Sequence, residues 1–287
     1  MTVGIIGLGI MGTAYAKNLI EHGVAVAGTD PLADARQRLT DLGGTPHEKT
    51  GDWLGACDLV ILALVSPVVL REVCTELADI LSPGQVVLET GTFALVDKEA
   101  AHEILAAKGV HLLDCPVSGL GAQAYVGDIV MMASGDPVAV AQARPYMEHF
   151  TKKVIEAGAF GMGSRLKYVA NHAVALHNTA AAETLSYANA LGLDPAVTYD
   201  MLSSGAGQSK MSDLRMPMMI SGDYEPPTAS LKMFEKDLSV IGDDLRRLDL
   251  HVPLFEAVDR LYKEAMARVP DTHDAAAVFE AYRKRGE

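Results

Sequence analysis

The stretch Val3-Gly-Ile-Ile-Gly-Leu-Gly-Ile-Met-Gly12 decides how the chain folds. Its first residues are mostly β-branched and apolar, which is typical of a buried strand. Glycines follow this strand directly, and Met11–His22 then continues with helical character until Gly23. A strand, a glycine-rich turn and a helix in this order predict the start of a strand–helix–strand unit with parallel strands.

The same alternation continues through the first half of the chain. The predicted strands are Val3–Gly7, Val24–Thr29, Leu59–Leu64, Gln85–Glu89, Val110–Asp114 and Ile129–Ala133, and the predicted helices are Met11–His22, Pro31–Leu42, Val69–Leu81 and Asp97–Ala107. The run Leu59–Leu64 is apolar throughout, as expected for a parallel strand that is buried on both faces. We therefore expect a doubly wound α/β sheet.

The pattern becomes helical after the glycine-rich segment 158–163. Arg165–Leu191 contains no Gly or Pro, a further helical run follows Pro195, and Ala229–Leu248 and Leu254–Arg268 also have helical character. These observations predict a Rossmann-type domain at residues 1–161 and an all-helical domain at residues 162–287, joined by a long helix.

Composition narrows the choice of partners and of compartment. The 287 residues are 49% apolar and 21% charged, as in a globular protein, and their net charge of −13 disfavours nucleic acid and anionic membranes as partners. The most apolar stretch, 58–70, is shorter than the ~20 residues of a membrane-spanning helix. Three scattered cysteines and the lack of a basic leader predict a cytoplasmic protein, and no metal-ligand spacing is present.

The glycine pattern predicts a dinucleotide site. In G-x-G-x-x-G, the first glycine permits the tight turn, the second lets the backbone approach a pyrophosphate, and the third allows close packing of helix on strand. A glycine-rich turn without a ligand is the alternative. The residues expected to bind the cofactor through this loop are Gly7, Leu8, Gly9, Ile10, Met11 and Gly12.

Asp30 ends the second predicted strand, where an acidic side chain accepts hydrogen bonds from the adenosine ribose and repels the extra phosphate of NADP. We therefore expect NAD as the cofactor, with NADP disfavoured. Arg36 and Arg38 lie nearby in the sequence and weaken this preference unless they are solvated on the following helix.

Further segments resemble one family. The segment 114–122, Asp-Cys-Pro-Val-Ser-Gly-Leu-Gly-Ala, resembles a substrate-binding loop, and Gly161-Met-Gly-Ser-Arg-Leu-Lys167-Tyr-Val-Ala-Asn171 resembles a G-x-G-x-x-x-K-x-x-x-N catalytic motif. Lys236-Asp-Leu238 and the opening glycine motif through Asn18 match as well. The whole chain thus resembles the β-hydroxyacid dehydrogenases of the 3-hydroxyisobutyrate dehydrogenase type.

The resemblance implies that Lys167 and Asn171 are catalytic and also bind substrate. Both lie on one face of a predicted helix because they are spaced i and i+4. Oxidation of an alcohol needs a base for the hydroxyl proton, and a lysine amine serves where burial and a neighbouring cation lower its pKa. Asn171 would hold the lysine or the substrate hydroxyl. An exposed lysine and a capping asparagine are the alternative reading.

The resemblance also implies a carboxylate site at Ser118, Gly119 and Leu120, and cofactor contacts at Leu64, Val65, Thr92 and Lys236. Leu120 stands where the family usually has a second glycine, which leaves the substrate open. Two structural roles are the alternatives to binding. Leu120 would then contribute only to packing, and Lys236 would form an exposed ion pair with Asp237.

The expected function is hydride transfer between NAD and a small β-hydroxy acid, with Lys167 as general acid and base. The alternatives are an imine or ketone reductase of the same fold, which commonly lacks the lysine, and a non-catalytic NAD-binding sensor. The long apolar helix that begins near Arg165 predicts a homodimer or homotetramer.

Overall fold

The computed structural model describes residues 1–283, and the chain divides into two compact units, Met1–Lys167 and the part that begins at Tyr168. The first unit alternates strands with helices, whereas the second is helical. The elements of the first unit are β1 (Thr2–Ile6), α1 (Ile10–Glu21), β2 (Ala25–Thr29), α2 (Ala33–Asp41), β3 (Thr45–His47), the 3-10 helix η1 (Asp52–Ala56), β4 (Leu59–Leu62), α3 (Pro67–Ile80), β5 (Val86–Glu89), α4 (Leu95–Ala106), β6 (His111–Asp114), β7 (Val117–Ser118), α5 (Gly121–Tyr125), β8 (Val130–Ser134), α6 (Pro137–Phe150) and β9 (Lys153–Gly158).

The strands of the first unit form one nine-stranded sheet. Its parallel part has the order β3-β2-β1-β4-β5-β6, and the order reverses beside β1, where β4 pairs on the side opposite to β2. Ligands of doubly wound folds bind at such a reversal, outside the carboxyl ends of the strands. The prediction of a doubly wound α/β domain followed by helices is confirmed.

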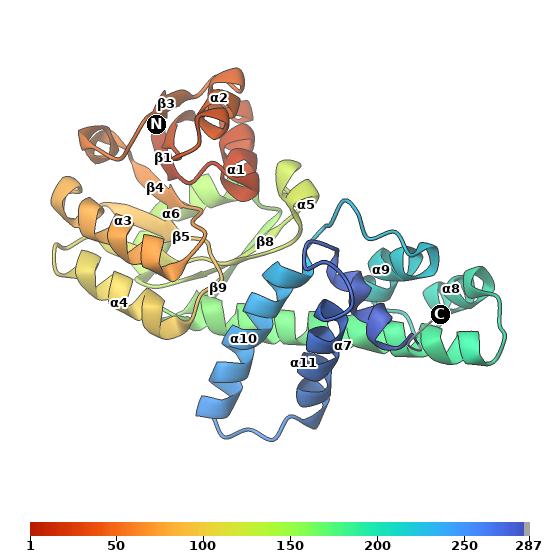
Figure 1. Cartoon of the computed structure of the whole chain (residues 1–287). Helices are drawn as coiled ribbons and strands as arrows, with labels where there is room; N and C mark the ends of the chain where they lie inside the picture. The colour runs from red at the N-terminus through yellow and green to blue at the C-terminus, as the bar shows by residue number, and fades with distance from the viewer. Residues whose placement is uncertain (284–287) are drawn as a thin grey trace. The chain divides into compact units, whose positions relative to one another are not determined.

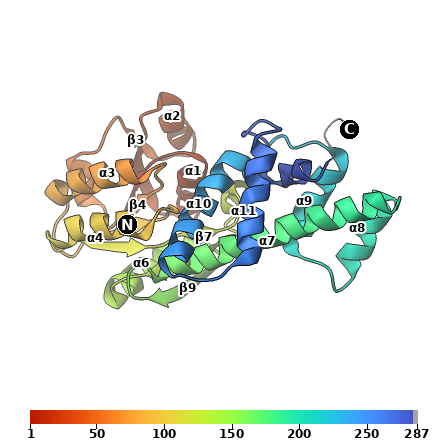
Figure 2. The same cartoon turned by 60° about the horizontal axis from the view of Figure 1, so that its bottom comes forward.

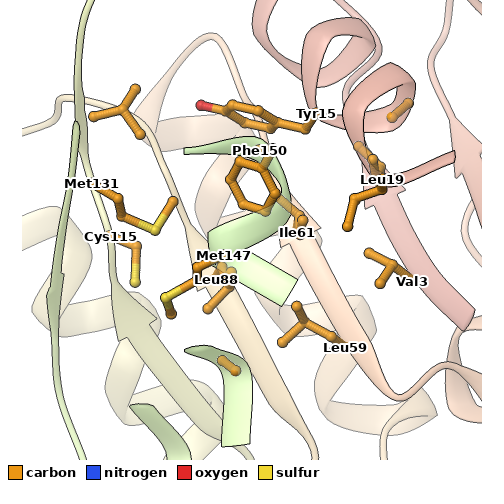
Figure 3. Packing of buried hydrophobic residues seen from close by; sticks show 14 of the residues in the cluster. Val3, Tyr15, Leu19, Leu59, Ile61, Leu88, Cys115, Met131, Met147 and Phe150 are labelled. Carbon is orange, nitrogen blue, oxygen red and sulfur yellow. The ribbon is translucent and has the colours of Figure 1, made fainter. Parts of the chain in front are cut away.

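Helices cover both faces of this sheet (Figure 1). Along β4, Leu59 and Ile61 pack on the face covered by α1 and α6, while Val60 and Leu62 pack on the face covered by α3 and α4. Figure 3 shows the first of these cores, in which Phe150 lies beneath Tyr15 with ring centroids 4.8 Å apart. The apolar run in the sequence thus reflects burial of alternate residues on both faces.

The antiparallel end of the sheet differs from the expected all-parallel arrangement. β8, the strand expected at Ile129–Ala133, pairs antiparallel with β6 and with β7. Only the short helix α5 separates β7 from β8, and a parallel crossover needs a connection of about a dozen residues or more. The short connection therefore turns the chain back on itself.

Sequence patterns did not predict β3, β7, β9, α5, α6 or α9. The strands among them lack an apolar run: β3 has three residues and contains Pro46, β7 has two residues, and most of β9 is exposed. Edge strands bury few side chains, so their sequences carry little periodic signal.

The second unit is helical in the residues described. Its elements are α7 (Met162–Ala190), which begins in the first unit, α8 (Pro195–Ser204), α9 (Lys210–Ser221), α10 (Leu231–Arg247), α11 (Pro253–Met266) and the 3-10 helix η2 (Ala275–Ala281). Figure 2 shows α7 as one continuous helix. Met216, Met219 and Phe234 belong to the buried core of this unit, which the helices around them enclose. No helix within residues 1–283 is both long enough and apolar enough to cross a membrane.

Candidate functional site

The glycine-rich loop connects β1 to α1. Gly7 has a positive φ of 93°, and a Cβ on Gly12 would lie 1.9 Å from the carbonyl oxygen of Gly7. Both positions therefore exclude a side chain because of the protein's own backbone. At Gly9, by contrast, a Cβ would meet no heavy atom within 4 Å. The open space beside Gly9 is where a ligand can approach the backbone.

The N-terminus of α1 has neither a side-chain cap at Gly9 nor an acidic residue in its first turn. Ser66 and Asp136 provide such caps for α3 and α6 through hydrogen bonds to backbone N–H groups. The first-turn N–H groups and the positive end of the helix dipole are suited to a pyrophosphate. The loop therefore fits the phosphates of a dinucleotide.

Asp30 follows β2 and lies against the glycine-rich loop. Its carboxylate accepts hydrogen bonds from the backbone N–H of Leu8 at 2.8 Å and of Leu32 at 2.9 Å. Arg36 donates to the carbonyl oxygen of Asp30 at 2.6 Å, and Arg38 donates to that of Leu8 at 3.2 Å. The two guanidinium groups thus bind backbone beside Asp30, which corrects the picture of two merely solvated side chains.

Other predicted cofactor contacts follow two parallel strands. Leu64 and Val65 come after β4, and Val65 is 83% exposed. Thr92 comes after β5 and is half-buried. The carboxyl ends of β1, β4 and β5 lie at one edge of the sheet because these strands are parallel neighbours. The first unit therefore brings these residues to the edge that holds the glycine-rich loop.

The predicted carboxylate site lies at the end of β7 and the start of α5. Ser118 ends β7, and the backbone N–H of Leu120 donates to Oε1 of Gln123 at 2.9 Å. A Cβ on Gly121 would lie 2.5 Å from Cγ2 of Ile10, so this loop lies against the glycine-rich loop. No sequence pattern predicted that the Leu120 N–H has a partner within its own loop.

Asn18 links the helices that follow the two loops. Its side chain is 5% exposed and donates to the carbonyl oxygens of Ala14 at 2.7 Å and Ala124 at 3.0 Å. These bonds join α1 to α5. The resemblance in sequence included Asn18 but assigned no contact to it.

The catalytic motif forms the first turns of α7. A Cβ on Gly163 would lie 2.4 Å from the carbonyl oxygen of Met132 and 2.6 Å from that of Asp114, so the helix starts in direct backbone contact with the sheet. The N–H groups of residues 162–165 donate to Ala159 O, Ser134 Oγ, Asp114 Oδ2 and Gly161 O respectively. Lys167 follows one turn later and is half-buried.

In the second unit, Asp237 links the two remaining predicted residues. Its Oδ2 accepts a hydrogen bond from Nδ2 of Asn171 at 2.8 Å, and its Oδ1 lies 3.4 Å from Nζ of Lys236. Asn171 is 8% exposed. The structure thus shows Asp237 as a side-chain partner of the Asn171 amide nitrogen.

Two further residues, Asn178 and Phe234, are buried in the second unit. Asn178 is fully buried and donates to the hydroxyl of Tyr262 and to the carbonyl oxygen of Ala275, and Phe234 is 5% exposed. Their polar and apolar groups are used in packing. Among residues 1–283, no cluster of three His, Cys, Asp or Glu side chains could hold a metal ion.

Comparison with known proteins agrees with this geometry. Residues 2–158 match the NAD binding domain of 6-phosphogluconate dehydrogenase, and residues 161–282 match the family described as NAD-binding of NADP-dependent 3-hydroxyisobutyrate dehydrogenase. The L-threonate dehydrogenase of Cupriavidus necator is 32% identical over 284 residues, which are 98% of this chain and 95% of that protein.

Solved structures point the same way. The 3-hydroxyisobutyrate dehydrogenase of Salmonella typhimurium has a TM-score of 0.88 at 28% identity, with 98% of this chain and 99% of that chain covered. The 3-hydroxyisobutyrate dehydrogenase of Mycobacterium tuberculosis, solved with L-serine, has a TM-score of 0.90 at 26% identity, with 99% of both chains covered. The chain therefore carries NAD-binding domains and belongs to the β-hydroxyacid dehydrogenase family.

Proposed function

We propose that this protein is an NAD-dependent dehydrogenase of small β-hydroxy acids, in which Lys167 is the general acid and base. The observation that carries the proposal is the anchoring of the first turn of α7 to Asp114 and Ser134, one turn before Lys167. The same unit contains the glycine-rich loop and the Ser118 loop, which lie against one another at Ile10 and Gly121.

The bound dinucleotide supplies the hydride acceptor for oxidation and the hydride donor for reduction. Lys167 accepts the proton of the substrate hydroxyl during oxidation and returns it to the carbonyl oxygen during reduction. Asp237 holds the amide nitrogen of Asn171 through the 2.8 Å hydrogen bond, which makes the amide oxygen the group that accepts from a hydroxyl or an ammonium donor.

Ser118 and Gly119 are proposed to bind the substrate carboxylate with a hydroxyl and a backbone N–H. The backbone N–H of Leu120 already donates to Gln123. It can bind the substrate carboxylate only when this hydrogen bond breaks. Gln123 is therefore a competitor for the anion at this loop.

The names of the relatives support a hydroxy acid as substrate. L-Threonate, 3-hydroxyisobutyrate and L-serine all carry a carboxylate together with a hydroxyl on the β-carbon. A β-hydroxy acid of the 3-hydroxyisobutyrate type is the proposed substrate class, with L-threonate as the second candidate because that relative is 32% identical.

NAD is proposed over NADP because Asp30 is fixed beside the loop by two backbone N–H groups. A carboxylate at this position accepts a ribose hydroxyl and repels a 2′-phosphate. Arg36 and Arg38 lie close to the same backbone and reduce this repulsion. The proposed preference for NAD is therefore moderate in size.

Residues 1–161 are proposed as the cofactor domain and residues 162–287 as the substrate and dimerisation domain. The helix α7 presents the exposed apolar side chains of Leu166, Val169 and Tyr187, which supports a homodimer or homotetramer. Light scattering coupled to size-exclusion chromatography would measure the mass, and a monomer at micromolar concentration would contradict this assignment.

The test of the function is a spectrophotometric assay at ~340 nm, where reduced nicotinamide absorbs, with NAD or NADP and a panel of acids. The panel contains 3-hydroxyisobutyrate, L-threonate, 3-hydroxypropionate, glycerate and serine. Turnover with one of them supports the proposal. Turnover of cyclic imines alone would favour the reductase alternative, and NADH binding without any turnover would favour the sensor.

A further inference from the structure

A cluster of three charged side chains is buried inside the first unit. Lys98 on α4, Glu89 at the end of β5 and Asp114 at the end of β6 all have 0% exposure. Nζ of Lys98 lies 2.5 Å from Oε2 of Glu89 and 2.7 Å from Oδ1 of Asp114. Removing such charges from water is costly, and apolar side chains would pack the same space at less cost. The cluster therefore calls for a role other than stability alone.

Nζ of Lys98 donates hydrogen bonds to Oδ1 of Asp114 and to the carbonyl oxygen of Gly91, both at 2.7 Å, and forms an ion pair with Oε2 of Glu89. Burial lowers the pKa of Lys98, but the two carboxylates outweigh burial and hold this pKa above its usual value. The ammonium is thus charged at neutral pH. It fixes the Asp114 carboxylate in one orientation.

The fixed carboxylate points at the start of α7. Asp114 accepts hydrogen bonds from the Ser164 backbone N–H at 2.7 Å and from the Ser164 hydroxyl at 2.8 Å. Ser134 completes the contact, since its Oγ donates to Asp114 and accepts the N–H of Gly163 at 2.9 Å. An anion at this position also interacts favourably with the helix dipole.

We propose that Lys98, Asp114 and Ser134 are positioning residues for Lys167, an inference that rests on the proposed role of Lys167. These hydrogen bonds hold the first turn of α7 against β6 and β8. At Gly163 the helix backbone is in direct contact with the backbone of both strands. Lys167 projects from the next turn of the same helix. The position of the Lys167 amine therefore depends on the Lys98–Asp114 ion pair, which is fully buried and acts only through the helix.

The experiment is a double-mutant cycle between Asp114→Asn and Lys167→Ala. The rate constant of hydride transfer is measured in a single turnover, and NADH affinity is measured by nucleotide fluorescence. In the wild-type background, Asp114→Asn is expected to slow hydride transfer by about 10- to 100-fold, because misplacement of about 1 Å has effects of this size. NADH affinity is expected to stay within about threefold.

In the Lys167→Ala background, Asp114→Asn is expected to cost less than about threefold, because the group that it positions is already absent. A general structural role would instead give the same loss in both backgrounds, and that result would overturn the inference. An unchanged rate for Asp114→Asn alone would also overturn it. If Lys167→Ala itself keeps the wild-type rate, the proposed function has failed, which is a separate result.

If Asp114→Asn does not fold, Ser134→Ala takes its place in the double-mutant cycle with Lys167→Ala. This variant keeps all three buried charges. It removes the acceptor of the Gly163 N–H and is expected to slow the same step by about 3- to 10-fold, again only when Lys167 is present. The matched controls are Asp136→Asn and Ser209→Ala, which alter the N-terminal caps of α6 and α9. Neither control is expected to change hydride transfer.

Discussion

The carboxylate of Asp114 accepts both the backbone N–H and the hydroxyl of Ser164, at 2.7 and 2.8 Å, although the two residues lie 50 positions apart in the chain. This contact joins the carboxyl end of β6 to the first turn of α7. The proposed acid and base, Lys167, lies one turn further along the same helix. The geometry of the first unit therefore determines where this lysine is placed.

Replacing Lys167 by alanine should lower turnover by about 10²- to 10⁴-fold, the usual contribution of a general acid or base. NADH should still bind, because the glycine-rich loop is unchanged. Steady-state rates and NADH titration would measure both quantities. Lys108→Ala, which removes a lysine that is 52% exposed, serves as the control and should leave the rate unchanged. Full activity of Lys167→Ala would remove the central role of this lysine.

The glycines of the loop should separate cofactor binding from stability. Gly9→Ala should keep the thermal midpoint, since its Cβ meets no atom within 4 Å, but should weaken NADH binding by filling the space that a pyrophosphate needs. Gly12→Ala should lower the midpoint because its Cβ would lie 1.9 Å from the Gly7 carbonyl oxygen. Differential scanning calorimetry and NADH titration would test this pair. Unchanged NADH affinity in Gly9→Ala would count against the pyrophosphate position.

Asp30→Ala should raise the ratio of NADP to NAD efficiency by about tenfold or more. The carboxylate that repels a 2′-phosphate is lost, while Arg36 and Arg38 remain beside the loop. The comparison is kcat/KM with each cofactor. Asp34→Ala, in the first turn of α2, is the control that removes an acidic residue without changing the carboxylate at the loop. An unaltered ratio in Asp30→Ala would show that another residue selects the cofactor.

Lys98→Met should lower the free energy of unfolding by about 3–5 kcal/mol, since it leaves two buried carboxylates without their cation. Urea unfolding followed by the fluorescence of Trp53 would measure the change, because this is the single tryptophan of the chain. Lys108→Met removes only an exposed pair with Asp79 and should cost less than about 1 kcal/mol. Equal losses of unfolding free energy in the two variants would contradict the expectation that the buried ion pairs of Lys98 stabilise the fold more than an exposed pair does.

The Lys98 cluster should also keep its effect over a wide pH range. The folded pKa of Lys98 lies above the unfolded value of 10.5, so its stabilisation is complete below that value and is lost only as the pH rises through the folded pKa. The difference in the free energy of unfolding between the wild type and Lys98→Met should therefore not decrease between pH 8 and pH 10. Both values lie below the folded pKa of Lys98, where the loss is expected. A difference that disappears by pH 9 would contradict this sign.

The three cysteines should resist alkylation in the folded protein. All three are buried and free, and burial raises the pKa of Cys57 to about 11 and that of Cys74 to about 12. A higher thiol pKa leaves less of the reactive thiolate at pH 8. Mass spectrometry after iodoacetamide treatment should show modification only when urea is present. Rapid labelling of Cys57 in native buffer would contradict the burial.

Much of the fold was predictable from local patterns. The strands around Ile5, Ile61 and Leu88 were expected because each is a short apolar run, and the long helix that carries Lys167 was expected because it lacks Gly and Pro. Edge strands such as β9 were not, because most of their side chains are exposed and leave no periodic trace.

The candidate site was predictable only in its local parts. Glycine spacing indicated the cofactor loop, and the spacing of Lys167 and Asn171 placed them on one helical face. The partners of these groups could not be predicted, since Asn171 bonds to Asp237 and the Leu120 N–H bonds to Gln123. The buried hydrogen bond of Asn178 to the carbonyl oxygen of Ala275 has no local sequence signal either, because the two residues lie 97 positions apart.

The sequence by itself determined the buried apolar strands and most of the longer helices, and where the chain makes the glycine turn before α1. Apolar periodicity and glycine positions act over a few residues, so a short stretch of sequence contains the whole signal. Only the tertiary structure decided that β8 runs antiparallel to β6 and that Lys98 and Asp114 hold the start of α7. Such contacts depend on the order of strands in the sheet, which brings together side chains that no local pattern connects.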